Sequence, residues 1–200
     1  MYRLLETIKI RDGEMIHRTY HESRMNRSRH ELLAIADTID LTQVAIPKIL
    51  NNNQVYKCRI VYSREIEDVR YTEYHPRKIR SLQIIRDDQI EYSCKYLERS
   101  YFEELKSKAP GSDEIIIVKN GWVTDTTYSN LVFYDGKQWL TPSTPLLKGT
   151  KRAYYLDIGK IREAPIREND IFDFQKVCLI NAMLDIEDGV CVNTQKIINP

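Results

Sequence analysis

Three functional groups follow one another along this chain in an order that suits amine chemistry. Lys95 supplies a primary amine, Asp125 supplies a carboxylate, and residues 149–151 open a predicted helix whose backbone N–H groups can bind an anion. A lysine amine attacks an aldehyde only when it is unprotonated, which partial burial and nearby positive charge favour. This order of groups favours an enzyme.

The composition is that of an ordinary globular protein. With 200 residues, the chain is long enough for one mid-sized domain or two small ones. Its 30 Lys and Arg residues against 29 Asp and Glu residues give a formal net charge of +1, so we expect no nucleic acid partner. No apolar run approaches the roughly 20 residues that span a bilayer, so we expect no membrane partner and a cytoplasmic location.

The four cysteines, Cys58, Cys94, Cys178 and Cys191, lie far apart in the sequence. They include no C-x-x-C pair, and no histidine stands at metal-ligand spacing from them. The sequence therefore predicts neither a zinc site nor a disulfide scaffold.

The start of the chain predicts an α/β lobe. Residues 4–10 and 15–18 form a predicted hairpin around an Asp-Gly turn. Thr19 and Glu22 have capping-box spacing, which predicts a helix over residues 21–38. Strands rich in β-branched and aromatic residues are then expected to pair with the hairpin, at 55–63, 67–73 and 81–85.

A polar break at residues 86–88 is expected to separate this lobe, residues 1–87, from a second one, residues 88–200. The second lobe is predicted to begin with a helix over residues 95–108. A β meander with Asn-Gly and Asp-Gly turns should follow, with strands at 114–118, 122–125, 130–134 and 138–141. A helix over 150–158 and strands at 177–181 and 190–193 complete the prediction.

Five motifs together resemble the class IV aminotransferases, a family that includes branched-chain and D-amino-acid transaminases and aminodeoxychorismate lyase. They run from Leu4 to Asn181 and contain Glu6-Thr7 in a strand, H-E-S-R-M-N-R-S, K-Y-L-E-R, G-W-V-T-D-T-T-Y-S-N-L and L-L-K-G-T-K-R. The segment K-Y-L-E-R, which begins at Lys95, is more similar to the lyases than to the transaminases. The resemblance implies a mixed α/β fold like that of D-amino-acid aminotransferase, with a small N-terminal α/β lobe and a larger, β-rich C-terminal lobe.

The resemblance also implies a cofactor, pyridoxal 5'-phosphate. Lys95 would be the catalytic lysine that holds it through a Schiff base, and Asp125 would pair with the pyridine nitrogen and keep the ring an electron sink. The family usually has glutamate at this position, and aspartate is shorter by one methylene. Asn130 is expected to stabilise the loop after Asp125 by its side-chain amide.

The phosphate of the cofactor would have two kinds of donor. The family pattern G-I-T-R appears here as G-T-K-R, so the backbone donors of the helix start remain while the hydroxyl moves by one position. Arg24 would add a charge-assisted contact. The implied phosphate contacts are therefore Arg24, Gly149, Thr150, Lys151 and Asn181. Thr7 and Arg99 are possible contacts of the substrate or cofactor.

The resemblance favours an aminodeoxychorismate lyase, which converts 4-amino-4-deoxychorismate to 4-aminobenzoate and pyruvate in folate biosynthesis. An amino-acid transaminase of the branched-chain or D-amino acid type is the first alternative. Both would take a small-molecule amine substrate and form a homodimer. Family members usually carry a leading segment that lines the substrate pocket, whereas Met1 stands five residues ahead of Glu6. A catalytically weak relative that binds a cofactor or a partner is the second alternative.

Overall fold

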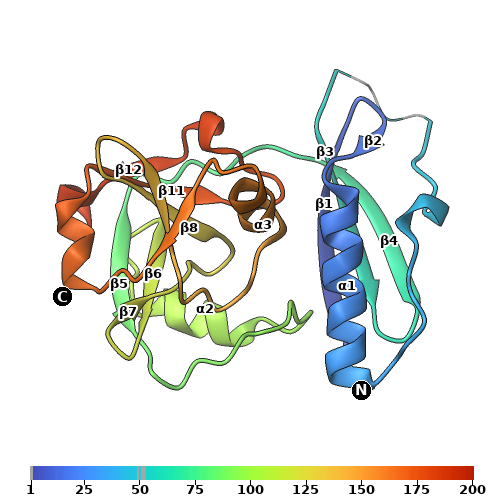
Figure 1. Cartoon of the computed structure of the whole chain (residues 1–200), viewed down its shortest axis with the longest axis horizontal. Helices are drawn as coiled ribbons and strands as arrows, with labels where there is room; N and C mark the ends of the chain where they lie inside the picture. The colour runs from blue at the N-terminus through green and yellow to red at the C-terminus, as the bar shows by residue number, and fades with distance from the viewer. Residues whose placement is uncertain (1, 49, 51–52) are drawn as a thin grey trace. The chain divides into compact units, whose positions relative to one another are not determined.

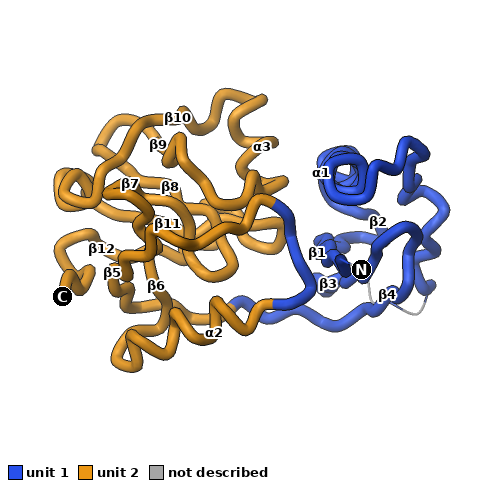
Figure 2. The backbone as a smooth tube through the Cα atoms, turned by 90° about the horizontal axis from the view of Figure 1, so that it is seen from below, with its two compact units in different colours: residues 1–76, 94–98 blue, residues 77–93, 99–200 orange. Residues whose placement is uncertain are grey.

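The computed structural model describes residues 2–48, 50 and 53–200 (Figure 1). The chain divides into two compact units (Figure 2). Unit 1 contains residues 1–76 and 94–98, and unit 2 contains residues 77–93 and 99–200. This division differs from the predicted boundary at residue 87, because residues 77–87 belong to unit 2 and the later segment 94–98, which carries Lys95, belongs to unit 1.

Unit 1 is an antiparallel sheet with the strand order β2-β1-β3-β4 and one long helix along it (Figure 1). Four hydrophobic side chains, those of Ile8, Ile60, Met25 and Leu41, belong to the core between them. The elements are β1 (Leu4–Arg11), β2 (Glu14–Met15), α1 (Arg18–Leu33), the 3-10 turn η1 (Leu41–Gln43), β3 (Tyr56–Tyr62) and β4 (Ile66–Glu73). The strands predicted at 4–10, 55–63 and 67–73 are confirmed, whereas the strand predicted at 15–18 ends at Met15, and α1 begins at Arg18.

Helix α1 begins and ends earlier than predicted. It follows His17, which adopts the left-handed conformation, and stops at Ala34, which adopts it again. The predicted capping box is wrong, because no side chain caps this helix and Glu22 accepts a hydrogen bond from the backbone N–H of Leu41 instead. Sequence spacing alone could not reveal that the carboxylate of Glu22 binds the backbone of a loop that is 19 residues away in the sequence.

Unit 2 contains two sheets. One has five strands in the order β10-β9-β8-β11-β12, and the other has three in the order β5-β6-β7. The strands are β5 (Leu82–Arg86), β6 (Glu114–Lys119), β7 (Trp122–Val123), β8 (Asn130–Tyr134), β9 (Trp139–Pro142), β10 (Arg162–Ala164), β11 (Lys176–Ile180) and β12 (Cys191–Asn193). The helical segments are α2 (Ser100–Ser107), α3 (Thr150–Asp157) and the 3-10 turns η2 (Asn169–Asp173), η3 (Ile186–Asp188) and η4 (Thr194–Lys196).

Two predictions about strand pairing are corrected by this topology. β5 does not join the opening hairpin; it pairs in parallel with β6 of unit 2. The expected meander is split, since β6 pairs with β7 while β8 pairs with β9 and β11 in the other sheet. Strand propensity marks where strands occur, but partners depend on which apolar faces meet in the core. That core includes Leu82, Ile116, Leu131, Phe133 and Val177.

The segment around Lys95 is not helical, contrary to the prediction of a helix over residues 95–108. It lies along β1, where the backbone N–H of Leu5 donates to the carbonyl of Lys95 at 2.8 Å and that of Leu97 donates to the carbonyl of Arg3 at 2.9 Å. Helix α2 starts only at Ser100. Pairing with the edge of β1 therefore overrides the apolar spacing that suggested a longer helix.

The cysteines also correct a prediction. Cys178 on β11 and Cys191 on β12 are directly opposite each other in the antiparallel pair and form a disulfide. Cys58 and Cys94 are free and buried. A linear separation of 13 residues says nothing about register, which is why spacing did not predict this bond.

Among the described residues, no helix is both long enough and apolar enough to cross a membrane.

Candidate functional site

In unit 1 the candidate site is built by strand β1, helix α1 and the Lys95 segment. Alternation along β1 places Glu6 on the same face as Ile8 and Ile10, the face that contributes to the core. Helical spacing places His21, Arg24 and Met25 on one side of α1, and all three are buried. A carboxylate, an imidazole and a guanidinium thus enter an otherwise apolar layer.

These three side chains form one hydrogen-bonded cluster, in which Glu6 is 0% exposed, His21 1% and Arg24 6%. Arg24 donates from Nε to Oε2 of Glu6 at 3.1 Å and from Nη2 to Oε1. His21 Nδ1 lies 2.7 Å from Oε1, and the backbone N–H of Thr7 donates to the same oxygen at 3.2 Å. The carboxylate is therefore fully engaged by its neighbours, as a buried charge requires.

The electrostatics of this cluster fix its charge state. Burial alone would raise the pKa of Glu6, but the charges and hydrogen bonds of Arg24 and His21 hold that pKa well below its usual range. Burial lowers the pKa of His21, and the positive charges of Arg24 and Lys95 oppose its protonation further, against the attraction of Glu6. Near neutral pH the cluster therefore contains an ionised Glu6, a charged Arg24 and a neutral His21 that donates its Nδ1 proton.

Lys95 belongs to the same unit and acts electrostatically on His21. The structure thus places the predicted catalytic lysine and the predicted phosphate arginine in one compact unit, where the charges of both act on His21. Thr7 follows Glu6 on β1, and its side chain points to the opposite face of the strand.

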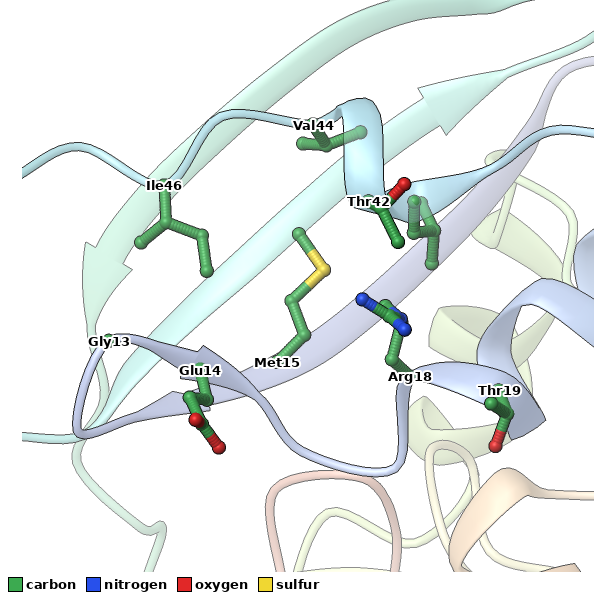
Figure 3. A pocket seen from close by; sticks show the side chains of 9 residues that line it. Gly13, Glu14, Met15, Arg18, Thr19, Thr42, Val44 and Ile46 are labelled. Atoms are coloured by element: carbon green, nitrogen blue, oxygen red, sulfur yellow. The ribbon is translucent and has the colours of Figure 1, made fainter.

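A separate hollow in unit 1 contains none of these groups. It is lined by the turn after β1, the start of α1 and the segment around η1, including Met15, Arg18, Leu41 and Ile46 (Figure 3). Since neither Lys95 nor Arg24 lines it, we do not assign it to the candidate site.

In unit 2 the buried carboxylate of Asp125 accepts hydrogen bonds at both oxygens. Asn130 donates from Nδ2 to Oδ1 at 2.7 Å, and the backbone N–H of Leu147 donates to Oδ2 at 2.9 Å. Burial raises the pKa of Asp125 to about 7, although these two hydrogen bonds and the charge of Arg152 act in the opposite direction. Asp125 therefore ties the loop before α3 to the start of β8.

Asn130 completes this tie. Its Nδ2 also donates to the carbonyl of Leu147 at 2.8 Å, and its Oδ1 lies where a side chain at position 149 would stand. Only glycine fits at Gly149, because the Cβ of any other residue would clash with this oxygen. The expected role of Asn130 in stabilising the loop agrees with these contacts.

Helix α3 begins at this loop. Gly149 is its N-cap residue and has no side-chain cap, and Thr150 and Lys151 form the buried first turn. The ammonium group of Lys151 binds the carboxylate of Asp185. The group of Lys151 that could contact a phosphate is therefore its backbone N–H. In the same turn, the Nε atom of Arg152 is buried and has no hydrogen-bond partner within the described part of the chain, while Nη2 binds Glu163 and the carbonyl of Pro142.

Two other predicted contacts are engaged within unit 2. Asn181 donates from Nδ2 to the hydroxyl of Ser129 at 2.8 Å, and its Oδ1 accepts from the backbone N–H groups of Met183 and Leu184. Arg99 donates to the carbonyl of Thr127 and stacks over the ring of Phe102. The side-chain amide of Asn181 therefore stabilises the turn at residues 181–184.

Sequence reasoning missed Glu6 and His21. Their signal was present: Glu6 interrupts an alternating apolar face, and His21 precedes Arg24 by one helical turn. Both residues lie within the motifs of the family resemblance, Glu6 in Glu6-Thr7 and His21 at the start of H-E-S-R-M-N-R-S, but these motifs indicate no role for either.

Comparison with known proteins identifies the class to which this protein belongs. The sequence profile of the family "Amino-transferase class IV" matches residues 3–187, so the chain belongs to this family. An uncharacterized protein of Haemophilus influenzae is 40% identical over 188 residues, which cover 92% of this chain and 98% of that protein. A protein of Schizosaccharomyces pombe named "putative aminodeoxychorismate lyase" is 31% identical over 85 residues, 40% of this chain and 37% of that protein.

Solved structures agree with the family assignment. A chain named "putative 4-amino-4-deoxychorismate lyase", from Haemophilus somnus, is 31% identical with a TM-score of 0.86, covering 92% of this chain and 97% of that chain. A chain named as a putative amino-acid aminotransferase, from Mesorhizobium loti, is 20% identical with a TM-score of 0.76, covering 92% and 96%, which shows the fold alone. The predicted mixed α/β fold is confirmed. Class IV aminotransferases depend on pyridoxal phosphate, and a neighbour from Mycobacterium tuberculosis was solved with it bound.

Proposed function

We propose that this protein is a pyridoxal phosphate-dependent enzyme of the aminodeoxychorismate lyase type. The observation that carries the proposal is the similarity to the Haemophilus somnus chain, at 31% identity over nearly the full length of both. The lysine segment K-Y-L-E-R supports the same branch of the family. The reaction would convert 4-amino-4-deoxychorismate to 4-aminobenzoate and pyruvate.

The residues present fit the cofactor. Pyridoxal phosphate needs an amine for its aldehyde and cationic or N–H donors for its phosphate. Unit 1 supplies Lys95 together with the buried guanidinium of Arg24. Unit 2 supplies the start of α3, which has no side-chain cap, and the buried Nε of Arg152, which has no hydrogen-bond partner among the described residues.

Asp125 fits the cofactor differently from the usual glutamate. Its oxygens already accept hydrogen bonds from Asn130 and Leu147, but each carboxylate oxygen has two acceptor sites. A protonated pyridine nitrogen near Asp125 would favour the ionised carboxylate and oppose the rise in pKa that burial causes.

In the proposed mechanism each residue has a separate task. When bound, the cofactor supplies an electron sink for the bonds at the substrate carbon. Lys95 would hold the cofactor aldehyde through its amine, and its free amine would move a proton at the substrate carbon. As the family resemblance implies, Arg24 and the start of α3 would hold the phosphate, and Asp125 would stabilise positive charge on the ring nitrogen.

The first test is covalent trapping. We expect pyridoxal phosphate followed by borohydride to place a pyridoxyl group on Lys95, to be located by peptide mass spectrometry. Lys95→Ala should abolish this adduct, whereas Lys78→Ala, which removes an exposed lysine, should not. An adduct scattered over surface lysines would contradict the proposal.

A second test separates lyase from transaminase. A lyase should release 4-aminobenzoate and pyruvate from aminodeoxychorismate without any keto acid acceptor. A transaminase should convert the bound cofactor to pyridoxamine phosphate in a half-reaction with an amino acid. Adduct formation at Lys95 without either reaction would favour the catalytically weak relative, for which the internal hydrogen bonds of Asp125 are the structural argument.

A further inference from the structure

A buried carboxylate next to a predicted phosphate-binding arginine needs an explanation, because it also repels phosphate. Glu6 is fully buried, and it is ionised because its pKa is held low. A buried ion pair has a large desolvation cost and is weak evidence for stability by itself. The geometry of the contact suggests a positioning role.

A guanidinium group has two edges that can each bind an oxyanion through two parallel N–H donors. Glu6 binds the Nε/Nη2 edge of Arg24 with both of its oxygens. The second edge, formed by Nη1 and Nη2, is adjacent to the first and shares Nη2 with it. Because the guanidinium group is planar, a carboxylate on one edge fixes the plane and direction of the other.

His21 acts on the carboxylate rather than on the arginine. Its Nδ1 lies 2.7 Å from Oε1 of Glu6, the oxygen that also accepts from Nη2 of Arg24. Both His21 and Arg24 belong to α1, whereas Glu6 belongs to β1. Since His21 is neutral near pH 7, it orients Glu6 without adding a second cation that would compete with Arg24 for it.

We propose that Glu6 and His21 are positioning residues, which hold the Arg24 guanidinium in the orientation in which its Nη1/Nη2 edge binds the cofactor phosphate. This inference rests on the proposed function, since it assumes that Arg24 meets that phosphate. It assigns a role to two residues that do not touch the reacting atoms.

The test compares equilibrium binding of two probes, pyridoxal phosphate and pyridoxal. Both carry the aldehyde that Lys95 binds, but only the first carries the phosphate. The ratio of their dissociation constants therefore measures the phosphate contact, and it needs no catalytic turnover. Absorbance of the bound cofactor gives both constants.

Glu6→Gln should weaken binding of pyridoxal phosphate by at least about tenfold, the size of one charge-assisted hydrogen bond, and leave pyridoxal binding unchanged. Arg24→Gln sets the maximum loss. Glu67→Gln, the same substitution at an exposed ion pair with Arg3 in unit 1, should leave both constants at the wild-type values.

A conservative pair at position 21 tests the second residue and provides a measurement where Glu6→Gln does not fold. His21→Asn keeps a neutral N–H donor close to the position of Nδ1, so it should retain most of the wild-type preference for pyridoxal phosphate. His21→Leu removes the donor and should lose the preference. Circular dichroism melting curves identify variants that are unfolded at the binding temperature.

The outcomes separate the two proposals. If the wild-type protein binds neither probe at Lys95, both the proposed function and this inference are wrong. If Arg24→Gln abolishes the preference while Glu6→Gln and His21→Leu keep it, or weaken both probes equally, the function stands and the positioning role is wrong.

Discussion

Asp125 is a carboxyl group whose charge changes within the physiological pH range. Its pKa is raised to about 7 by burial, from an ordinary value of 3.8. A carboxyl group with a raised folded pKa binds its proton more tightly in the folded state, so its contribution to stability is present at low pH and is lost as pH rises through 7.

Asp125→Asn should remove this dependence. The difference between the unfolding free energies of wild type and variant should fall as pH rises from 4 to 7.5, by about 1.4 kcal/mol for each unit of pKa difference. Urea midpoints at four pH values measure the slope, which is independent of any constant loss caused by the amide. Asp113→Asn is the control, because hydrogen bonds from Arg80 and Ser81 lower the pKa of Asp113 and its titration lies below this range. Parallel curves for Asp125→Asn and wild type would contradict the assignment.

At the residue scale, the sequence motifs identified the candidate site residues but not the side chains that bind them. Lys95, Arg24 and Asp125 were each marked by a motif, whereas the carboxylates that bind Arg24 and Lys151, Glu6 and Asp185, lie 18 and 34 residues away in the sequence. Such partners are set by which faces of β1, α1 and α3 are buried, and a linear pattern does not contain that information.

At the element scale, the loop that leads into α3 is held by the side chains of Asn130 and Asp125. Asn130 contacts Asp125, Leu147 and the position of Gly149 together. The loop and the helix start therefore behave as one rigid piece, fixed to the first residue of β8.

Gly149→Ala should destabilise the loop before α3 and the start of that helix. Its Cβ would clash with Oδ1 of Asn130 and lie 3.1 Å from Cγ, and Asn130 cannot move without losing its hydrogen bonds to Asp125 and Leu147. We expect a loss of about 1–3 kcal/mol in unfolding free energy, measured by urea titration. Gly111→Ala is the matched control, since nothing lies within 4 Å of its added Cβ and its φ is not in the left-handed region.

A double variant checks the cause of the Gly149→Ala effect. Asn130→Ala removes the oxygen that the new Cβ meets, so adding Gly149→Ala to it should cost much less than in the wild type. Full additivity of the two losses would show that the clash is not responsible.

The elements themselves were largely predictable, because alternation and Asx-Gly turns are local signals. β1, β3, β6, β8 and α3 appear within a residue or two of the predicted bounds. Failures occurred where tertiary pairing overrode local preference: residues 95–97 pair with β1 instead of joining α2, and β5 pairs with β6 instead of with the opening hairpin.

At the scale of the whole molecule, the thiol count tests the chain's one covalent cross-link among the described residues. We expect a thiol reagent to find two reactive cysteines in the denatured, unreduced protein and four after reduction, since Cys178 and Cys191 are bonded. Cys58→Ser should lower each count by one. Four thiols before reduction would contradict the disulfide.

Reduction should also destabilise unit 2. For a loop of about 15 residues, a disulfide contributes on the order of 3 kcal/mol, largely by restricting the unfolded chain. A melting temperature that is the same with and without reductant would show that the bond contributes little here.

The return of residues 94–98 to unit 1 has a consequence for synthesis of the chain. Residues 1–76 leave the ribosome first, and at that stage the end of β1 near Leu5 has no neighbour on the side where the backbone of Lys95 later binds. Unit 1 is completed only after residues 77–93, which belong to unit 2, have been translated. The segment that carries Lys95 is therefore the last part of the first unit to be translated, and no gene fragment that ends at residue 76 can encode it.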